Sequence, residues 1–218
     1  LSLKASIINP RQSDSDILLL IRNICDERQQ QAELEKLSQY DSLTGLPNRA
    51  MALSTLQHAL ELNARHHRKV AVLALDLDRF KEVNDQFGHD AGDNLLLQVS
   101  HRLKTSARSS DTIARLGGDE FIIILEGLKK GLTARHVADK VLAELSKPFI
   151  YESQVINLSA SIGVGIFPDN GDRADILLRN ATSAMYKVKS TGNSDYHFYT
   201  PDLNRAAHSQ QQLESELR

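Results

Sequence analysis

The run VAVLALDLD at residues 70–78 constrains the fold more than any other feature of the sequence. It is apolar almost without a break until its first aspartate. Such a run is typical of a central strand whose two faces are both covered. The chain is therefore expected to place this strand inside a sheet that other elements cover.

Helices and further strands alternate with this run. Helical spacing of apolar residues predicts helices over about 49–67, around Leu95–Leu103, over about 133–146 and over about 174–190. A loop holding Gly88 and Gly92 is expected before the second of these helices. LSASIGVGIF and YHFYT are strand-like, and DTIARLGGDEFIIILEG is typical of a β-hairpin because two β-prone runs flank Gly-Gly. The prediction is an α/β fold, an α+β sandwich with a central mixed sheet of about five strands flanked by helices.

The two ends of the chain differ from its middle. LKASII and ILLLIRNI are strand-like runs joined by turn signals, and the polar run over 25–40 is expected to form an exposed connecting helix. We expect three parts: residues 1–40, a main domain over 41–200 and a polar tail over 201–218. Because the chain begins with Leu, it is expected to be a piece of a longer protein.

Composition narrows the class of protein. The 218 residues carry a formal net charge of −2, which argues against a nucleic-acid partner and against contact with an anionic membrane. The single cysteine, Cys25, excludes an internal disulfide and suits the cytoplasm. The apolar run at 17–24 is too short to span a bilayer, and no signal peptide is evident.

Acidic residues gather at one predicted edge of the sheet. Asp76 and Asp78 lie two apart at the end of the buried strand, so both side chains leave the same face. Asp119 and Glu120 stand at the tip of the predicted hairpin, and a hairpin beside the strand would bring the two pairs together. Such acids raise one another's pKa values unless a cation such as Mg²⁺ joins them. On spacing alone, solvated acids beside a flexible Gly-Gly turn explain the pattern equally well.

Further polar residues lie in the stretch RFKEVNDQFGHDAGD at 79–93. Lys81 can neutralise phosphate, and Asn84 with Asp93 offers the donors and acceptors that match the amide edge of guanine. The simpler explanation of each residue alone is a loop or cap position. Only their grouping indicates a nucleotide.

These motifs together resemble the GGDEF family of diguanylate cyclases. The resemblance covers residues 41–199 and rests on DSLTGLPNR, DLDRFKEVNDQFGHDAGD, GGDEF, SIGVGIF and ADILLRNATSAMYKVKSTGN, in that order. It implies a nucleotidyl-cyclase or polymerase-palm-like fold with the signature on the hairpin. It also implies a reaction that needs Mg²⁺ or Mn²⁺ and joins two GTP molecules into cyclic di-GMP, with release of two pyrophosphates.

The resemblance implies roles for individual residues. The catalytic residues would be Asp119 and Glu120, and the metal ligands would be Asp76, the Leu77 carbonyl and Asp119. GTP would be bound by Asn84, His89, Asp93, Phe80, Lys81 and Lys189. Because each domain would bind one GTP, catalysis would need a homodimer. The chain departs from the family at Asn193, where many members carry a phosphate-binding arginine, and at Arg79, which is often aromatic.

The stretch RSSD at 108–111 matches the family's RxxD inhibitory site, where cyclic di-GMP would act as an allosteric inhibitor. The arginine fork of Arg108 suits guanine edges and phosphates, and Asp111 can accept from guanine N–H groups. The alternative is a capping or salt-bridge pair on a loop. A second arginine is not evident on the 133–146 helix, and Lys140 is the nearest substitute, so weaker feedback inhibition is expected.

The ends resemble neighbouring domains of such proteins. Residues 1–30 are similar to the last hairpin of a PAS sensor domain, and the tail is similar to the helix that leads to an EAL phosphodiesterase domain. A PAS–GGDEF–EAL parent is therefore expected, cytoplasmic in this segment even if it is membrane-anchored upstream. Two functions stay open: an active cyclase, and a module that binds GTP or cyclic di-GMP and controls an attached EAL domain without making product.

Overall fold

The computed structural model describes residues 3–8, 18–23, 38–128, 132–191 and 194–202. The chain divides into two units, Leu1–Gln39 and Tyr40–Arg218, and each is described by itself. In the first unit, β1 (Leu3–Ile8) pairs antiparallel with β2 (Leu18–Asn23), as the two strand-like runs indicated. The predicted connecting helix before residue 38, the tail after residue 202 and Asn193 lie outside the described residues.

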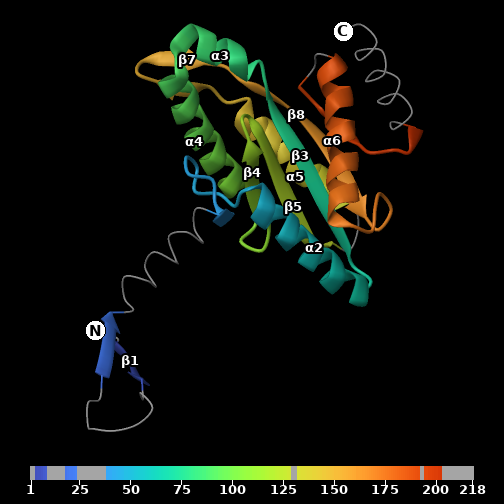
Figure 1. Ribbon diagram of the computed structural model, residues 1–218. Helices are drawn as coiled ribbons and strands as arrows, with labels where there is room; N and C mark the ends of the chain where they lie inside the picture. The colour runs from blue at the N-terminus through green and yellow to red at the C-terminus, as the bar shows by residue number, and fades with distance from the viewer. Residues whose placement is uncertain (1–2, 9–17, 24–37, 129–131, 192–193, 203–218) are drawn as a thin grey trace, which may run out of the picture. The chain divides into compact units, whose positions relative to one another are not determined.

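The second unit is built on one sheet of five strands in the order β4-β5-β3-β8-β9 (Figure 1). The strands are β3 (Lys69–Asp78), β4 (Thr112–Gly117), β5 (Glu120–Leu128), β8 (Ser159–Phe167) and β9 (Tyr196–Phe198). β3 pairs antiparallel with β5 and with β8, whereas β9 runs parallel to β8. The predicted mixed sheet is confirmed, and the apolar run that predicted it is the central strand.

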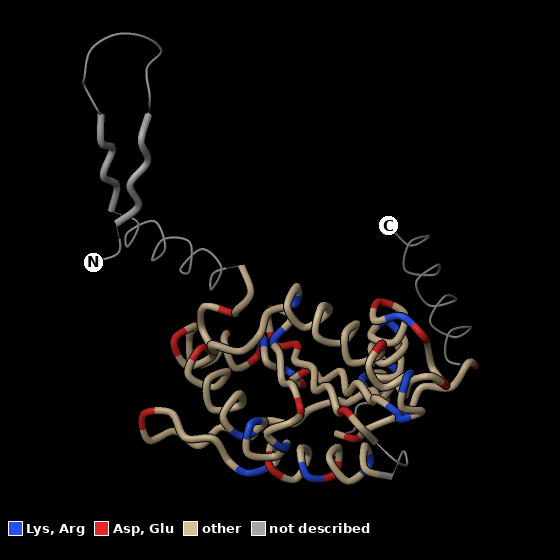
Figure 2. The backbone as a smooth tube through the Cα atoms, turned by 90° about the horizontal axis from the view of Figure 1, so that it is seen from below, with Lys and Arg blue, Asp and Glu red and all other residues tan. Residues whose placement is uncertain are grey.

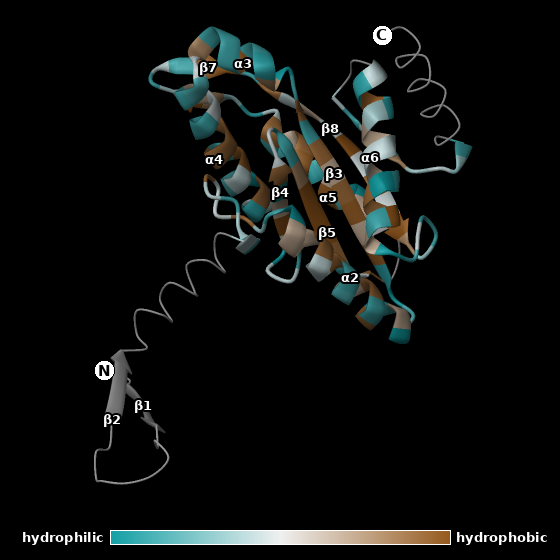
Figure 3. Ribbon diagram, in the orientation of Figure 1, coloured by the Kyte–Doolittle hydropathy of each residue, from teal (hydrophilic) through white to brown (hydrophobic). Residues whose placement is uncertain are grey.

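Helices cover both faces of this sheet. They are α2 (Arg49–Arg65), α3 (Phe80–Phe87), α4 (His89–Ser106), α5 (Leu132–Leu145) and α6 (Ala174–Thr191). Side chains of β3 alternate between two cores: Leu73 and Leu75 pack with α3, α4 and α5, whereas Val72 and Ala74 pack with α2 and α6. Figure 3 shows the apolar strands lying between the helices. Burial on both faces explains why the run at 70–78 lacks alternation.

The segment after β3 differs from the expectation. Instead of a loop that holds two glycines, α3 ends at Phe87, Gly88 makes a turn with φ of 86°, and α4 begins at His89. Gly92 therefore lies in the first turn of α4. A short hairpin of β6 (Phe149–Tyr151) and β7 (Gln154–Ile156), which the sequence did not predict, precedes β8. Among the described residues, no helix has the length and apolarity needed to cross a membrane.

Candidate functional site

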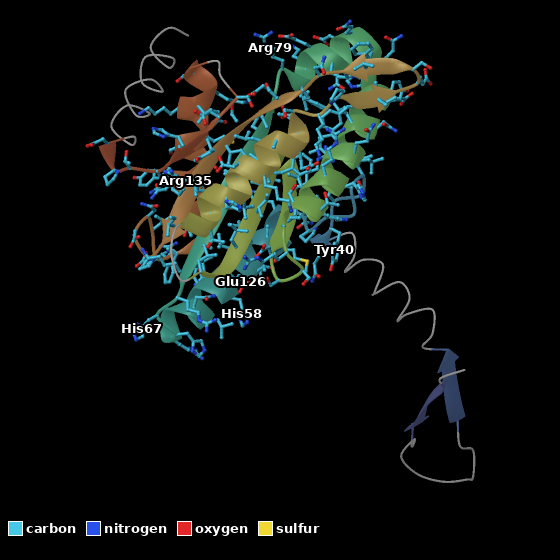
Figure 4. The ribbon with its side chains drawn as sticks, turned by 180° about the vertical axis from the view of Figure 1, so that it is seen from behind. Tyr40, His58, His67, Arg79, Glu126 and Arg135 are labelled. Atoms are coloured by element: carbon cyan, nitrogen blue, oxygen red, sulfur yellow. The ribbon has the colours of Figure 1, made fainter. Side chains whose placement is uncertain are left out.

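Acidic residues from two strands meet at one end of the sheet. Asp76, near the end of β3, lies directly opposite Glu120 at the start of β5, and Asp119 occupies the turn between β4 and β5. Arg79 lies at this end of the sheet and His67 at the other end (Figure 4). Over the rest of the domain, acidic and basic positions are interspersed (Figure 2). The antiparallel register thus brings together three of the four acids expected at this edge, Asp76, Asp119 and Glu120. The fourth, Asp78, is bound to β8 instead.

Asp76 is a buried carboxylate with an incomplete set of partners. Its side chain is 6% exposed, and Nζ of Lys189 lies 2.6 Å from its Oδ1. Apart from this ammonium, no described donor reaches Oδ1. Burial raises the pKa of Asp76 to about 6; Lys189 opposes this shift, and the charges of Asp119 and Glu120 add to it.

The chemistry of this acidic edge fits a hard divalent cation. Asp76 is buried, Lys189 is the described partner of its Oδ1, and the charges of two further carboxylates act on it, so a divalent cation that joins the group would be stabilising. Among the described residues, no three acidic, histidine or cysteine side chains are already gathered as a complete metal site. Mg²⁺ does not require such a set, because it is commonly held by one or two carboxylates together with water and substrate phosphates.

Asp78 has a different environment from Asp76. Its two carboxylate oxygens accept hydrogen bonds of 2.7 Å from the hydroxyls of Ser159 and Ser161 on the neighbouring strand β8. Both contacts lie across the strand pair in which Asp78 is opposite Ser159. Asp78 is therefore a satisfied acceptor that fastens the end of β3 to β8. It is not among the predicted metal ligands, and these contacts give it a structural role.

The two residues predicted to read guanine lie on neighbouring helices, Asn84 on α3 and Asp93 on α4. A Cβ at Gly92 would overlap Oδ1 of Asn84, so the amide of Asn84 lies directly against the backbone next to Asp93. Asn84 is half-buried, whereas Asp93 and His89 are exposed. The sequence pattern alone predicts a loop at Gly92 and gives it no role. Its missing side chain allows this close approach of α3 and α4.

The predicted phosphate-binding residues lie around the start of α3 and the end of α6. Phe80 is buried in the core, Lys81 is exposed, and Lys189 reaches the acidic edge from α6. A cavity of about 780 Å³ lies between α3 and the strands β7 and β8. Its lining includes Lys189 and Arg79, an exposed residue with φ of 57° at the corner between β3 and α3.

The RSSD stretch forms a tight turn after α4. The backbone N–H of Arg108 donates to Oδ2 of Asp111 over 2.9 Å, and the N–H of Asp111 donates to the carbonyl of Arg108 over 3.0 Å. The exposed guanidinium of Arg108 has no hydrogen bond or ion pair with any described residue. The turn thus accounts for one oxygen of Asp111, and the arginine fork remains available to a ligand.

Lys140 does not lie free beside this turn. Its Nζ donates to the carbonyls of Thr105 over 2.9 Å and Ser106 over 3.1 Å, which are in the last turn of α4. This contact joins α5 to the end of the helix that precedes Arg108. A lysine is well suited to this place because carbonyls at a helix C-terminus lack partners within the helix. Lys140 is therefore occupied as a helix cap.

Arg115 is a residue that the sequence reasoning left without a role. It begins RLGGDEF, and its guanidinium donates to the carbonyl of Gly118 through Nε over 3.0 Å and through Nη2 over 2.7 Å. The same side chain reaches Asp41, the first residue of DSLTGLPNR. Only the presence of an arginine and an acid in two separate turn-rich motifs hinted at this pairing.

The chain is similar to one family of known proteins over most of its length. The family model described as "Diguanylate cyclase, GGDEF domain" matches residues 38–195, which is most of the chain. Two curated relatives come from Pseudomonas aeruginosa. The chain is 40% identical over 186 residues to the bifunctional diguanylate cyclase/cyclic di-GMP phosphodiesterase MucR, covering 85% of this chain and 27% of MucR. It is 40% identical over 159 residues to the diguanylate cyclase TpbB, covering 72% of this chain and 37% of TpbB.

A solved structure shows the same fold. The GGDEF domain of TpbB from Pseudomonas aeruginosa superposes with a TM-score of 0.75 at 37% identity, covering 78% of this chain and 99% of that domain. The chain therefore matches a complete solved domain. It spans only 27% of the length of MucR and 37% of the length of TpbB.

Proposed function

Because the chain belongs to the GGDEF family of diguanylate cyclases, we propose that it condenses two GTP molecules into cyclic di-GMP and releases two pyrophosphates. The observation that carries this proposal is the acidic edge of the sheet. Asp76 is buried opposite Glu120 and close to the charge of Asp119, and Lys189 is the one described partner of its Oδ1. This edge has the donor chemistry that a metal–triphosphate complex needs.

Three groups of residues would bind the three parts of the metal–GTP complex: the metal, the guanine and the phosphates. Asp76, the Leu77 carbonyl and Asp119 hold Mg²⁺ or Mn²⁺, which supplies stabilisation of the charge that develops on the phosphate oxygens. Asn84 and Asp93 bind the guanine edge, with His89 at the same end of α4. Phosphate oxygens are bound at the start of α3 by Phe80 and Lys81 and from α6 by Lys189. This division is supported by the proximity of Asn84 to the backbone beside Asp93 and by the approach of Lys189 to Asp76.

The reaction joins the substrates of two domains. The 3′-hydroxyl of one GTP attacks the α-phosphorus of the other, the new P–O bond forms, and pyrophosphate leaves with the electrons of the broken bond. Glu120 is the residue we assign to the proton of the attacking hydroxyl, because it lies opposite Asp76 in the strand register. Two such transfers close the ring, so two domains must face each other around a two-fold axis.

Cyclic di-GMP is also proposed to inhibit the enzyme at Arg108 and Asp111. The exposed guanidinium of Arg108 supports this assignment, since a free arginine fork can bind phosphate or a guanine edge in two-pronged fashion. Lys140 caps the C-terminus of α4 in this chain, so its ammonium is bound to backbone carbonyls just before the RSSD turn. The inhibitory site would then depend on one arginine, and its affinity for product would be modest.

The test is to incubate the purified chain at high concentration with GTP and Mg²⁺ and to quantify cyclic di-GMP. We expect product from the unmodified chain and none from Asp119→Ala. Asp172→Ala is the matched control, because Asp172 is an exposed acid on a loop outside the acidic edge and should keep full activity. Saturable GTP binding without turnover, even when the domain is fused to a dimerising helix, would refute the cyclase function.

The second candidate is a regulatory module that binds GTP or cyclic di-GMP and controls an attached phosphodiesterase domain. One observation favours this regulatory module. The proposed metal ligand Asp76 is already paired with the ammonium of Lys189 in the nucleotide-free chain. MucR, which carries both activities in its name, supports the same pairing of domains. The forced-dimer assay separates the two candidates, because a module needs only different affinities in two states and no turnover.

The parent protein is proposed to have PAS–GGDEF–EAL architecture. Residues 1–40 would be the remnant of the sensor and its connecting helix, 41–200 the GGDEF domain and 201–218 the link to an EAL domain. The antiparallel pair β1–β2 supports the first assignment, since a PAS domain ends in such strands. GTP as substrate would place this segment in the cytoplasm. The coding sequence on either side of this segment would decide the architecture.

A further inference from the structure

Lys189 and Asp76 meet from two adjacent layers of the domain, a helix and the sheet on which it packs. Lys189 lies in the last turn of α6, which packs on one face of the sheet, and Asp76 lies near the end of the central strand β3. Nζ of Lys189 lies 2.6 Å from Oδ1 of Asp76. The carboxylate is 6% exposed and the lysine side chain 34% exposed. The ammonium therefore covers the acid from the solvent side while retaining a route to solvent.

This lysine is the counter-ion of more than one acid. Although its partial burial would lower the pKa of Lys189, the contact with Asp76 and the charge of Asp119 raise it overall, so the ammonium stays charged. Asp76 in turn feels the charges of Asp119 and Glu120. The ammonium of Lys189 thus lies where the negative charges of Asp76, Asp119 and Glu120 favour a cation. That is also the place where a divalent cation would bind.

We propose that, in the nucleotide-free domain, the ammonium of Lys189 occupies the position that a divalent cation would take beside Asp76. The cation can then bind Asp76 only when a triphosphate binds the ammonium in its place. This inference rests on the proposed function in one respect: the anion that receives the ammonium is taken to be the triphosphate of GTP. Lys189 is then a positioning residue that makes metal binding and nucleotide binding depend on each other.

Competition between like charges is the physical basis. A cation bound to Oδ1 of Asp76 would stand within a few ångströms of Nζ, and the two positive charges would repel strongly in this poorly solvated place. The ammonium must therefore leave for the metal to bind. Without an anion nearby it loses its only described ion-pair partner, which makes binding of the metal alone unfavourable.

The structure offers the displaced side chain somewhere to go. Lys189 and Arg79 both line the cavity of about 780 Å³ beside α3. Glu82 and Asp78 line it too, but both oxygens of Asp78 already accept from serine hydroxyls. A triphosphate at the mouth of this space can accept from Lys189 while its own oxygens share the metal with Asp76. Each ligand then improves the affinity of the other by the same factor, as linkage requires.

The first experiment measures binding of Mn²⁺ alone, followed by the electron paramagnetic resonance signal of the free ion, in the nucleotide-free chain. We expect Lys189→Met to bind Mn²⁺ about tenfold more tightly than the unmodified chain, a factor within the range typical of coupling between sites. Lys189→Gln should show the same gain in Mn²⁺ affinity. Agreement between the two variants would exclude an effect of the methionine side chain itself. Lys187→Met is the control, because Lys187 is exposed on the same helix and its replacement removes the same charge without touching Asp76.

The second experiment repeats the titration with a non-hydrolysable GTP analogue. In the unmodified chain the analogue should tighten Mn²⁺ binding strongly, whereas in Lys189→Met this ratio should shrink several-fold. Mn²⁺ affinity that is equal or weaker in both Lys189 variants overturns the inference. If Lys189→Met gains Mn²⁺ affinity while the unmodified chain forms no cyclic di-GMP, the inference stands and the cyclase function is what fails.

Discussion

The guanidinium of Arg115 donates to both carboxylate oxygens of Asp41, over 3.0 and 3.1 Å. The remaining donors of the same fork bind the carbonyl of Gly118, so one side chain ties the start of the domain to the turn that carries Asp119. Burial alone would raise the pKa of Asp41, but hydrogen bonds from Thr44 and Arg115 lower it below its ordinary value. The carboxylate of Asp41 is thus held in its ionised form, and Arg115 holds the turn at Gly118 against the start of the domain.

Loss of this fork should loosen the turn and destabilise the domain. We expect Arg115→Ala to lower the free energy of unfolding by about 2 kcal/mol, because a largely buried carboxylate loses its partner. Arg115→Lys keeps the charge but not the two-pronged geometry, and it should fall between the two. Urea denaturation at neutral pH measures all three proteins. A cost below about 0.5 kcal/mol for Arg115→Ala would mean that the fork is not important for stability.

The raised pKa of Asp76 predicts a stability that falls as pH rises. Its folded-state pKa is about 6, above the ordinary value of 3.8, so between these values the folded chain binds more protons than the unfolded chain. The proton is therefore stabilising at low pH, and the ionised carboxylate costs stability above about pH 6.

Asp76→Asn should accordingly stabilise the chelator-treated, nucleotide-free domain by about 1–2 kcal/mol at pH 7.5. The benefit should fade as the pH is lowered through 6 and vanish near 3.8. Thermal or urea unfolding at a series of pH values would show this convergence of the two proteins. A variant that is less stable than the unmodified chain at pH 7.5 would contradict the expected penalty and indicate that the ion pair with Lys189 outweighs it.

At Gly163 of β8, the backbone of α6 lies directly against the sheet. A Cβ at this position would overlap the carbonyl of Ala181 and the backbone N of Met185, and would lie 2.9 Å from the Cα of Met185. Because all of these are backbone atoms, the helix itself would have to move. We expect Gly163→Ala to cost about 3 kcal/mol.

Gly165→Ala is the matched comparison for that change, two residues along the same strand. Its nearest neighbours would be 3.1 Å away, and one of them is the end of the flexible Leu177 side chain. The cost there should be about 1 kcal/mol. Chemical denaturation of both variants checks the order. An equal loss in the two proteins would argue that the strand propensity or backbone entropy of glycine, and not the close approach, determines the result.

The assignment of Arg108 makes a prediction about feedback. Arg108→Ala should weaken the binding of cyclic di-GMP and raise the inhibition constant about tenfold. More product should therefore form before the reaction stalls. Isothermal titration with cyclic di-GMP and progress curves with GTP measure the two effects. Lys104→Ala, an exposed charge change on the preceding helix, serves as the control. Unchanged inhibition in Arg108→Ala would remove the proposed brake from this turn.

Local patterns in the sequence predicted most of the fold. The unbroken apolar run identified β3 as the central strand, and Gly-Gly between two β-prone runs identified the pair β4–β5. Helices expected over about 133–146 and 174–190 correspond to Leu132–Leu145 and Ala174–Thr191. These elements depend on residues near each other in the chain, and therefore their patterns can be read directly. The prediction of a glycine-containing loop after β3 was wrong, because Gly92 lies in α4. A glycine is required there because the side chain of Asn84 on α3 occupies the space that a Cβ would fill.

The sequence by itself thus determined which residues could carry chemistry, since acids at a strand end and at a Gly-Gly turn are visible in the letters alone. Only the tertiary structure decided how they are paired. It placed Lys189 on Asp76, Lys140 on the end of α4 and Arg115 on Asp41, contacts between segments far apart in the chain. Local spacing carries no information on such pairs, because they arise when helices pack on a sheet and burial leaves each charge to find the nearest partner.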